Sequence, residues 1–137
     1  MTATVTTSFT AGTPKQVAMV ANYLYNGMAY STPGNILVPV TGIYRVSATL
    51  TFSESASPAA FLIQVYDYTN GVAIDSLVSI STNSTFPSPV VGGGTELTLY
   101  PNIKYGISGE AVTNNGTLDV SDAVAVNHAS FSLVTRL

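Results

Sequence analysis

A strictly alternating run, GIYRVSATLTF at residues 42–52, constrains the fold of this chain more than any other feature. One side of the run carries Arg45 and hydroxyl side chains, and the other side is entirely apolar. The apolar residues are Tyr44, Val46, Ala48, Leu50 and Phe52. Because successive side chains of a strand point to opposite faces, this period of two predicts a β-strand with one face in a core.

Further short strands are predicted between turn signals. Residues 35–40 form one, at an edge or bend because of Pro39. Residues 60–68 are apolar on nearly both faces, which predicts a central strand or one covered by a neighbouring subunit. The pair Asn70-Gly71 then predicts a hairpin with a return strand at 72–81. Many short alternating strands favour an all-β fold, an antiparallel two-sheet sandwich, over any fold with crossover helices.

The second half of the chain predicts a loop and a second hairpin. Two prolines and three consecutive glycines at 82–94 indicate irregular structure. Strands at 95–100 and 103–112, joined at Pro101-Asn102, are expected to pair as a hairpin. The last strand is predicted at 127–137.

The N-terminal region is ambiguous. Residues 13–25 begin like a capped helix, with Thr13, Pro14 and Gln16, yet they also alternate as a strand would. In an otherwise all-β chain we favour the strand. We expect residues 1–12 to form an extended arm and residues 13–137 to form the sandwich domain.

The low charge excludes several classes of partner. Charged residues make up 8% of the 137 residues, against about 25% in typical soluble domains. The four basic residues are scattered singly, so we expect neither nucleic acid nor a membrane surface as a partner. Cysteine is absent, which excludes disulfides and thiolate metal sites. A surface with few charged residues loses little hydration free energy when another protein covers it, which favours an oligomer over a monomer.

The sequence offers little that predicts catalysis. His128 is the single histidine, so multi-histidine metal sites are excluded, and a solvated surface position is the simpler interpretation. Asp119 and Asp122 are close enough in sequence for Ca²⁺, although loop acids commonly serve solubility alone. Tyr23, Tyr25 and Tyr30 fit a sugar-stacking surface, but a subunit interface is the more common use of such tyrosines. We expect no enzymatic activity and no cofactor.

The run NILVPVTGIYRVSATLTF at 35–52 resembles the most recognisable segment of the C1q/TNF-like jelly-roll family. Gly42 and Tyr44 stand where that family has its characteristic glycine and aromatic residue, and Phe131 matches the closing strand. The composition is similar to jelly rolls of phage cement, knob and fibre proteins and of spore-surface collagen-like glycoproteins. The resemblance implies a jelly roll of about ten strands that assembles as a tight homotrimer.

A trimer of sandwiches would bury one apolar sheet face of each subunit around the three-fold axis. The strand at 60–68 is the predicted axis strand because it is apolar on both faces. Its candidate axis residues are Phe61, Leu62, Ile63, Val65 and Tyr66.

Two functions follow as expectations. The first is a non-enzymatic structural protein of a virion surface, a trimer that cements or decorates a capsid or tips a fibre, with a capsid or other virion protein as partner. The arm at 1–12 would attach it. The alternative is an extracellular or cell-surface recognition module, binding carbohydrate or protein through loops at 53–59 and 82–94.

Overall fold

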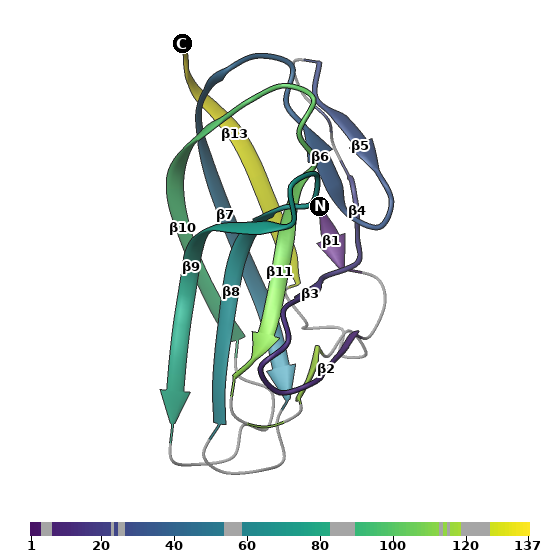
Figure 1. Ribbon diagram of the computed structural model, residues 1–137, viewed down its shortest axis with the longest axis vertical. Coiled ribbons are helices and arrows are strands. Elements are labelled where there is room, and N and C mark those ends of the chain that lie inside the picture. Colours follow the sequence, from purple (N-terminus) through teal and green to yellow (C-terminus); the bar gives the residue numbers. More distant parts are fainter. Residues whose placement is uncertain are drawn as a thin grey trace.

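The computed structural model describes residues 1–137 except 4–6, 23, 25–26, 54–58, 83–89, 113, 115 and 119–126. Every regular element in this described part is a strand, and every strand pair is antiparallel. The strands form two sheets that pack into a sandwich (Figure 1). The predicted all-β antiparallel sandwich is confirmed.

The first sheet is organised around β7 (Gly42–Ser53), the strand that the alternation predicted. β7 pairs along most of its length with β10 (Val90–Leu99) and β13 (His128–Arg136), and at its end with β12 (Gly116–Leu118). Beyond β13 lie β1 (Thr2–Ala3) and β4 (Met19–Val20), and beyond β12 lies β2 (Thr7–Phe9).

The second sheet has the order β5, β6, β11, β8, β9. Its strands are β5 (Ala29–Ser31), β6 (Asn35–Leu37), β11 (Tyr105–Ala111), β8 (Ala59–Asp67) and β9 (Val72–Thr82), and β3 (Lys15–Gln16) also pairs with β11. β6 ends before Pro39. This agrees with the prediction, because proline has no backbone N–H to donate to a neighbouring strand.

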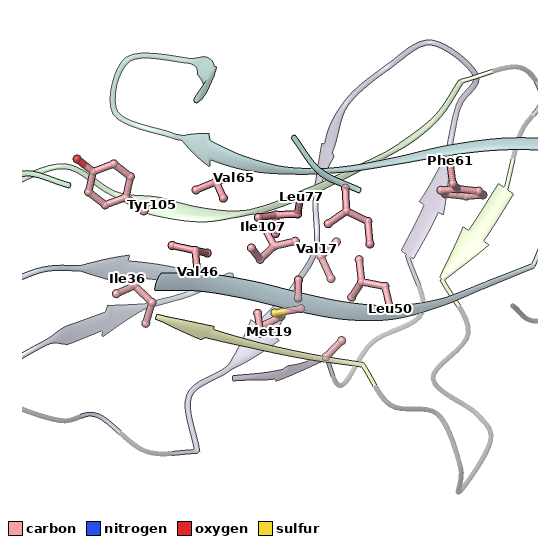
Figure 2. Close-up of a cluster of buried hydrophobic side chains, with 14 of the residues drawn as sticks. Val17, Met19, Ile36, Val46, Leu50, Phe61, Val65, Leu77, Tyr105 and Ile107 are labelled. Carbon is pink, nitrogen blue, oxygen red and sulfur yellow. The ribbon is translucent and has the colours of Figure 1, made fainter. Parts of the chain in front are cut away.

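The core lies between the two sheets. Figure 2 shows Val46 and Leu50 of β7 opposite Val65 and Ile107 of the second sheet. All five apolar residues of the alternating run are buried, and Arg45 on the other face is exposed. The alternation in the sequence therefore separates the side chains of the core from those on the surface.

Three aromatic rings join the sheets at one end of the core. Phe52 of β7 stacks on Phe61 of β8, with ring centroids 3.6 Å apart. Phe9 of β2 meets both rings edge-on, at centroid distances of 5.7 and 5.9 Å. Edge-on contacts place the positive ring edge against the negative face, which adds to the burial of apolar area.

The predicted hairpin at Asn70-Gly71 is confirmed, since β8 pairs with β9. Its turn is longer than a two-residue loop, because Asp67 pairs with Val72 and four residues lie between them. Within the pair, Gly71 has a positive φ of 72°. The Asp67 carboxylate accepts hydrogen bonds from the backbone N–H groups of Thr69 and Asn70, both at 2.9 Å. Side-chain bonding to the backbone thus shapes this turn.

The glycine-rich segment is not a loop as predicted. Gly92, Gly93 and Gly94 lie in β10 and pair with β7. A Cβ atom on Gly93 would overlap the carbonyl oxygen of Leu77 and the side chain of Val78 in β9. Glycine is needed here because β9 passes close to the β10 backbone, not because the chain is flexible.

The predicted second hairpin is also wrong. The turn at Pro101-Asn102 exists, and Asn102 has a positive φ of 67°. However, β10 pairs with β7 in the first sheet, whereas β11 pairs with β8 in the second. The turn therefore crosses between sheets, and the Tyr100 N–H donates to the Tyr105 hydroxyl across it at 2.9 Å.

Residues 1–12 do not form a separate arm in their described part. β1 pairs with β13 and β4, and β2 pairs with β12. Phe9 is buried in the core. This segment is part of the sandwich because its apolar side chains complete the core.

The ambiguous stretch at 13–25 has no helix in its described residues. It contributes the short strands β3 and β4, with Val17 and Met19 buried and Val20 exposed. The favoured interpretation, an extended alternating segment, is confirmed there. Tyr23 and Tyr25 lie outside the described residues.

Candidate functional site

The three residues that carry the family resemblance lie in the central strands of the first sheet. Tyr44 is fully buried in β7, and its hydroxyl donates to the carbonyl oxygen of Val40 at 3.0 Å. Burial raises the pKa of this phenol. A Cβ on Gly42 would lie 2.6 Å from the Thr135 carbonyl oxygen, so β13 leaves no room for a side chain at this position of β7. Phe131 of β13 is partly buried against the core.

The predicted axis strand is divided between two environments. Phe61, Ile63 and Val65 point into the core of the single chain and are at most 1% exposed. They cannot line an axis between subunits, because β7 and its neighbours already cover them. Leu62 and Tyr66 lie on the opposite, outer face of β8 and are half-buried.

The outer face of the first sheet carries a group of small side chains. We call this surface the β13–β7–β10 face. Alternation along the three strands puts on it Ser130, Ser132, Ser47, Thr49, Gly92 and Gly94. Ser47 and Ser130, which are directly opposite each other, share a hydrogen bond between their Oγ atoms at 2.8 Å. Over these residues the side chains are short, so another protein backbone can come close there, although Arg45, Glu96 and His128 lie on the same face.

One ion pair crosses this face. Arg45 Nη2 lies 2.6 Å from Glu96 Oε1, and the two residues are directly opposite each other on β7 and β10. The two side chains are 67% and 46% exposed. Because both remain in water, the pair contributes little to the stability of the single chain.

Apolar side chains are exposed at the end of the same sheet where β13 and β10 finish. Val134, Leu137 and Tyr100 are 46%, 67% and 49% exposed. The backbone N–H of Leu137 donates to the carbonyl oxygen of Thr41, which holds the chain end beside the start of β7. Exposed apolar groups at one end of a sheet are typical of a surface that contacts protein.

On the outer face of the second sheet, which we call the β8–β11 face, the chain's own side chains cover the part over β11. A Cβ on Gly106 would lie 2.9 Å from a ring carbon of Tyr68, which therefore lies over β11. The rings of Tyr66 and Tyr68 are 4.7 Å apart, and Gln16 Nε2 donates to Asn35 Oδ1 at 2.8 Å. Burial raises the pKa of the Tyr68 phenol well above its usual range.

The candidate catalytic and metal residues are not brought together. His128 is exposed on β13, directly opposite Thr2 and Thr49. Asp119, Asp122 and most of the two candidate loops, 54–58 and 83–89, lie outside the described residues. In the part of the chain that the structure describes, no group of three or more histidine, aspartate or glutamate side chains is placed to hold a metal ion. Nor does a helix long and apolar enough to span a membrane occur among these residues.

Tyr30 has a structural role in the described region. Its hydroxyl donates to the carbonyl oxygen of Met19 at 2.7 Å, which ties β5 to β4. Of the three tyrosines considered for sugar stacking, it is the one that the structure places, and its polar end is already used by the protein.

Sequence reasoning missed Gly92 and Gly94 as parts of a surface. The alternation of β7 shows which of its faces is buried but not which segments pair with its edges. Only the register shows that these glycines lie opposite Thr49 and Ser47.

Comparison with known proteins supports the fold. The structure of Eiger TNF from S. frugiperda matches with a TM-score of 0.50 over 90% of this chain and 90% of that chain. This chain has a TNF-like jelly-roll fold. The sequence identity is 12%, so the likeness concerns the fold alone. No protein family model matches this sequence, and no curated protein matches it.

Proposed function

We propose that this TNF-like chain is a non-enzymatic structural protein that assembles as a homotrimer and decorates a virion surface. The observation that supports the proposal most is the β13–β7–β10 face, where small uncharged side chains lie on the same sheet as the exposed Val134, Leu137 and Tyr100. The resemblance to C1q/TNF-like domains implies the homotrimer.

The physical argument for assembly rests on the cost of desolvation. Serine, threonine and glycine carry no charge, so covering them with another protein surface costs less than covering lysine or glutamate. Copies related by a closed three-fold axis bury the same face in each subunit. The face proposed here replaces the inner row of β8, which is already buried within the single chain.

The proposed mechanism on the virion is stabilisation by selective binding. A trimer that contacts adjacent capsid subunits binds the assembled shell and not its separated subunits. Mass action then shifts the equilibrium toward the shell without any chemical step.

Light scattering on a matched pair of variants tests the assembly. Ser130→Arg places a long charged side chain on the β13–β7–β10 face, and Ser79→Arg places one on the outer face of the second sheet. Both serines are exposed mid-strand positions of the single chain. We expect wild type and Ser79→Arg to have three times the 14.2 kDa mass of one chain, and Ser130→Arg to be a folded monomer. Monomeric wild type would contradict the trimer, and a trimeric Ser130→Arg would contradict the face.

Immunogold electron microscopy tests the location. An antibody against the purified chain should label the surface of virions from the source that encodes it. Label confined to cell envelopes or culture fluid would contradict the virion role and favour the extracellular recognition module. That alternative stays a prediction, because residues 54–58 and 83–89 of its loops lie outside the described part of the chain.

A further inference from the structure

In the turn between β8 and β9, the buried residue Asp67 is hydrogen-bonded to both residues of the Asn70-Gly71 dipeptide. Asp67 is 6% exposed, and it accepts three hydrogen bonds from the turn. The shortest runs from Asn70 Nδ2 to Asp67 Oδ2, at 2.6 Å. The next residue, Gly71, donates its backbone N–H to the carbonyl oxygen of Asp67 at 2.8 Å. Both partners of the Asn-Gly step are thus held by the same residue.

An asparagine followed by glycine can lose its side-chain amide without any enzyme. The backbone nitrogen of Gly71 attacks Cγ of Asn70, a new C–N bond forms, and the bond from Cγ to Nδ2 breaks. The nitrogen leaves as ammonia and takes the proton of the attacking N–H. Water then opens the cyclic imide at either carbonyl and leaves aspartate or isoaspartate. Glycine favours the attack because it has no Cβ to obstruct it.

The folded turn opposes both halves of this step. The attacking N–H must first give up its bond to the Asp67 carbonyl, and the leaving amide must give up its bond to the carboxylate. The second bond is charge-assisted, a class about twice as strong as neutral hydrogen bonds. We infer that Asn70 is a site of deamidation that Asp67 holds unreactive in the folded chain, and that the reaction weakens the turn once it occurs.

The weakening follows from the change in charge. Deamidation replaces Nδ2, a donor, with a carboxylate oxygen that can only accept. The 2.6 Å contact then joins two like charges, one of them on the buried Asp67 and the other on the exposed residue 70. The repulsion drives the side chain of residue 70 away from Asp67, and the turn loses the bond that fixed Asn70 there. The modification therefore loosens this end of the β8–β9 hairpin.

Site-resolved peptide mass spectrometry during incubation in mildly alkaline buffer tests whether Asp67 slows the deamidation of Asn70 in the folded chain. We expect Asn70 to react at least about tenfold more slowly in the folded wild type than in the chain unfolded in urea. Asp67→Asn keeps the shape of residue 67 but removes its charge, and should raise the rate in the folded protein by a smaller factor, because the bond from the Gly71 N–H to the backbone carbonyl of residue 67 remains. Asp75→Asn, on β9 of the same hairpin, should not change the rate at Asn70. Equal rates in folded and unfolded wild type would overturn the proposal, as would an Asp67→Asn rate equal to that of wild type.

A variant that imitates the product tests whether the reaction weakens the turn, and it stays informative if Asp67→Asn does not fold. Asn70→Asp should lower the midpoint of thermal unfolding by about 3–5 °C. Asn70→Ser removes the amide without adding a charge, and should lower the midpoint by less. An Asn70→Asp midpoint at or above that of Asn70→Ser would show that the added charge does not loosen the turn and would overturn this part of the proposal.

Discussion

The two outer faces of the sandwich differ in how they are covered. On the β8–β11 face, Tyr68 lies over Gly106, and Gln16 bonds to Asn35, so the chain covers the β11 part of this sheet, whereas Ser79 of β9 is exposed. On the β13–β7–β10 face, Ser47, Ser130 and the neighbouring glycines have short side chains or none, which cover little of the strand backbone. The comparison teaches that apolar composition alone does not identify an interface. The face with the smaller side chains is the one that we propose to contact another copy.

The largest change in the free energy of unfolding is expected in the core, which lies between the two sheets. Phe61→Ala removes a fully buried ring that stacks on Phe52, and should lower the free energy of unfolding of the chain by about 3–5 kcal/mol. Urea titration measures it. If the variant unfolded at the wild-type urea concentration but failed to assemble, Phe61 would belong to an axis after all.

A pair of glycine variants compares the two faces directly. Gly106→Ala forces a Cβ against the Tyr68 ring and the Gly34 backbone, and should cost about 1–3 kcal/mol. Gly92→Ala meets mainly the hydroxyl of Thr49, at 2.9 Å, which can rotate away, so the cost in the single chain should be smaller. Thermal unfolding of both variants under monomeric conditions, in the Ser130→Arg background, checks the order. Equal costs would mean that the two faces are covered alike.

Alkaline pH should lower the free energy of unfolding through Tyr68 on the β8–β11 face. The raised pKa of Tyr68 means that the folded chain keeps this phenolic proton at pH values where the unfolded chain loses it. The unfolded state then binds fewer protons, so the free energy of unfolding falls as the pH rises above about 10. Tyr68→Phe should reduce that fall, measured by urea titration between about pH 9 and pH 11. A fall as steep as that of wild type would mean that Tyr68 does not contribute to it.

The smallest effect on the single chain is expected on the β13–β7–β10 face. Arg45→Ala removes an exposed ion pair and should cost about 0.2–1 kcal/mol in the monomeric Ser130→Arg background. In the assembled protein the loss should be larger, because removal of Arg45 leaves Glu96 without its partner in a buried interface. Thermal midpoints in the two backgrounds give the comparison. The same shift in both would indicate that the pair stays in water.

The sequence predicted the fold better than it predicted the surfaces, for physical reasons. The alternation at 42–52 identified β7 because its two faces differ in polarity. Residues 60–68 have apolar side chains on both faces, and no local pattern shows that Phe61 is covered by the chain itself while Leu62 is on the outside. The glycines at 92–94 suggested a loop because glycine weakens strands, but their use depends on the approach of β9. Likewise, Pro101-Asn102 signals a turn but not the sheet to which the next strand belongs.

Cysteine labelling tests most directly whether the β13–β7–β10 face is where copies meet. The chain has no cysteine, so Ser130→Cys and Ser79→Cys each introduce a single thiol at an exposed position of the isolated chain, one on each sheet. Assembly through the β13–β7–β10 face predicts that a maleimide modifies Cys at position 79 rapidly, and Cys at position 130 only after dilution separates the subunits. Rapid modification at position 130 at concentrations where light scattering reports the full assembled mass would contradict it.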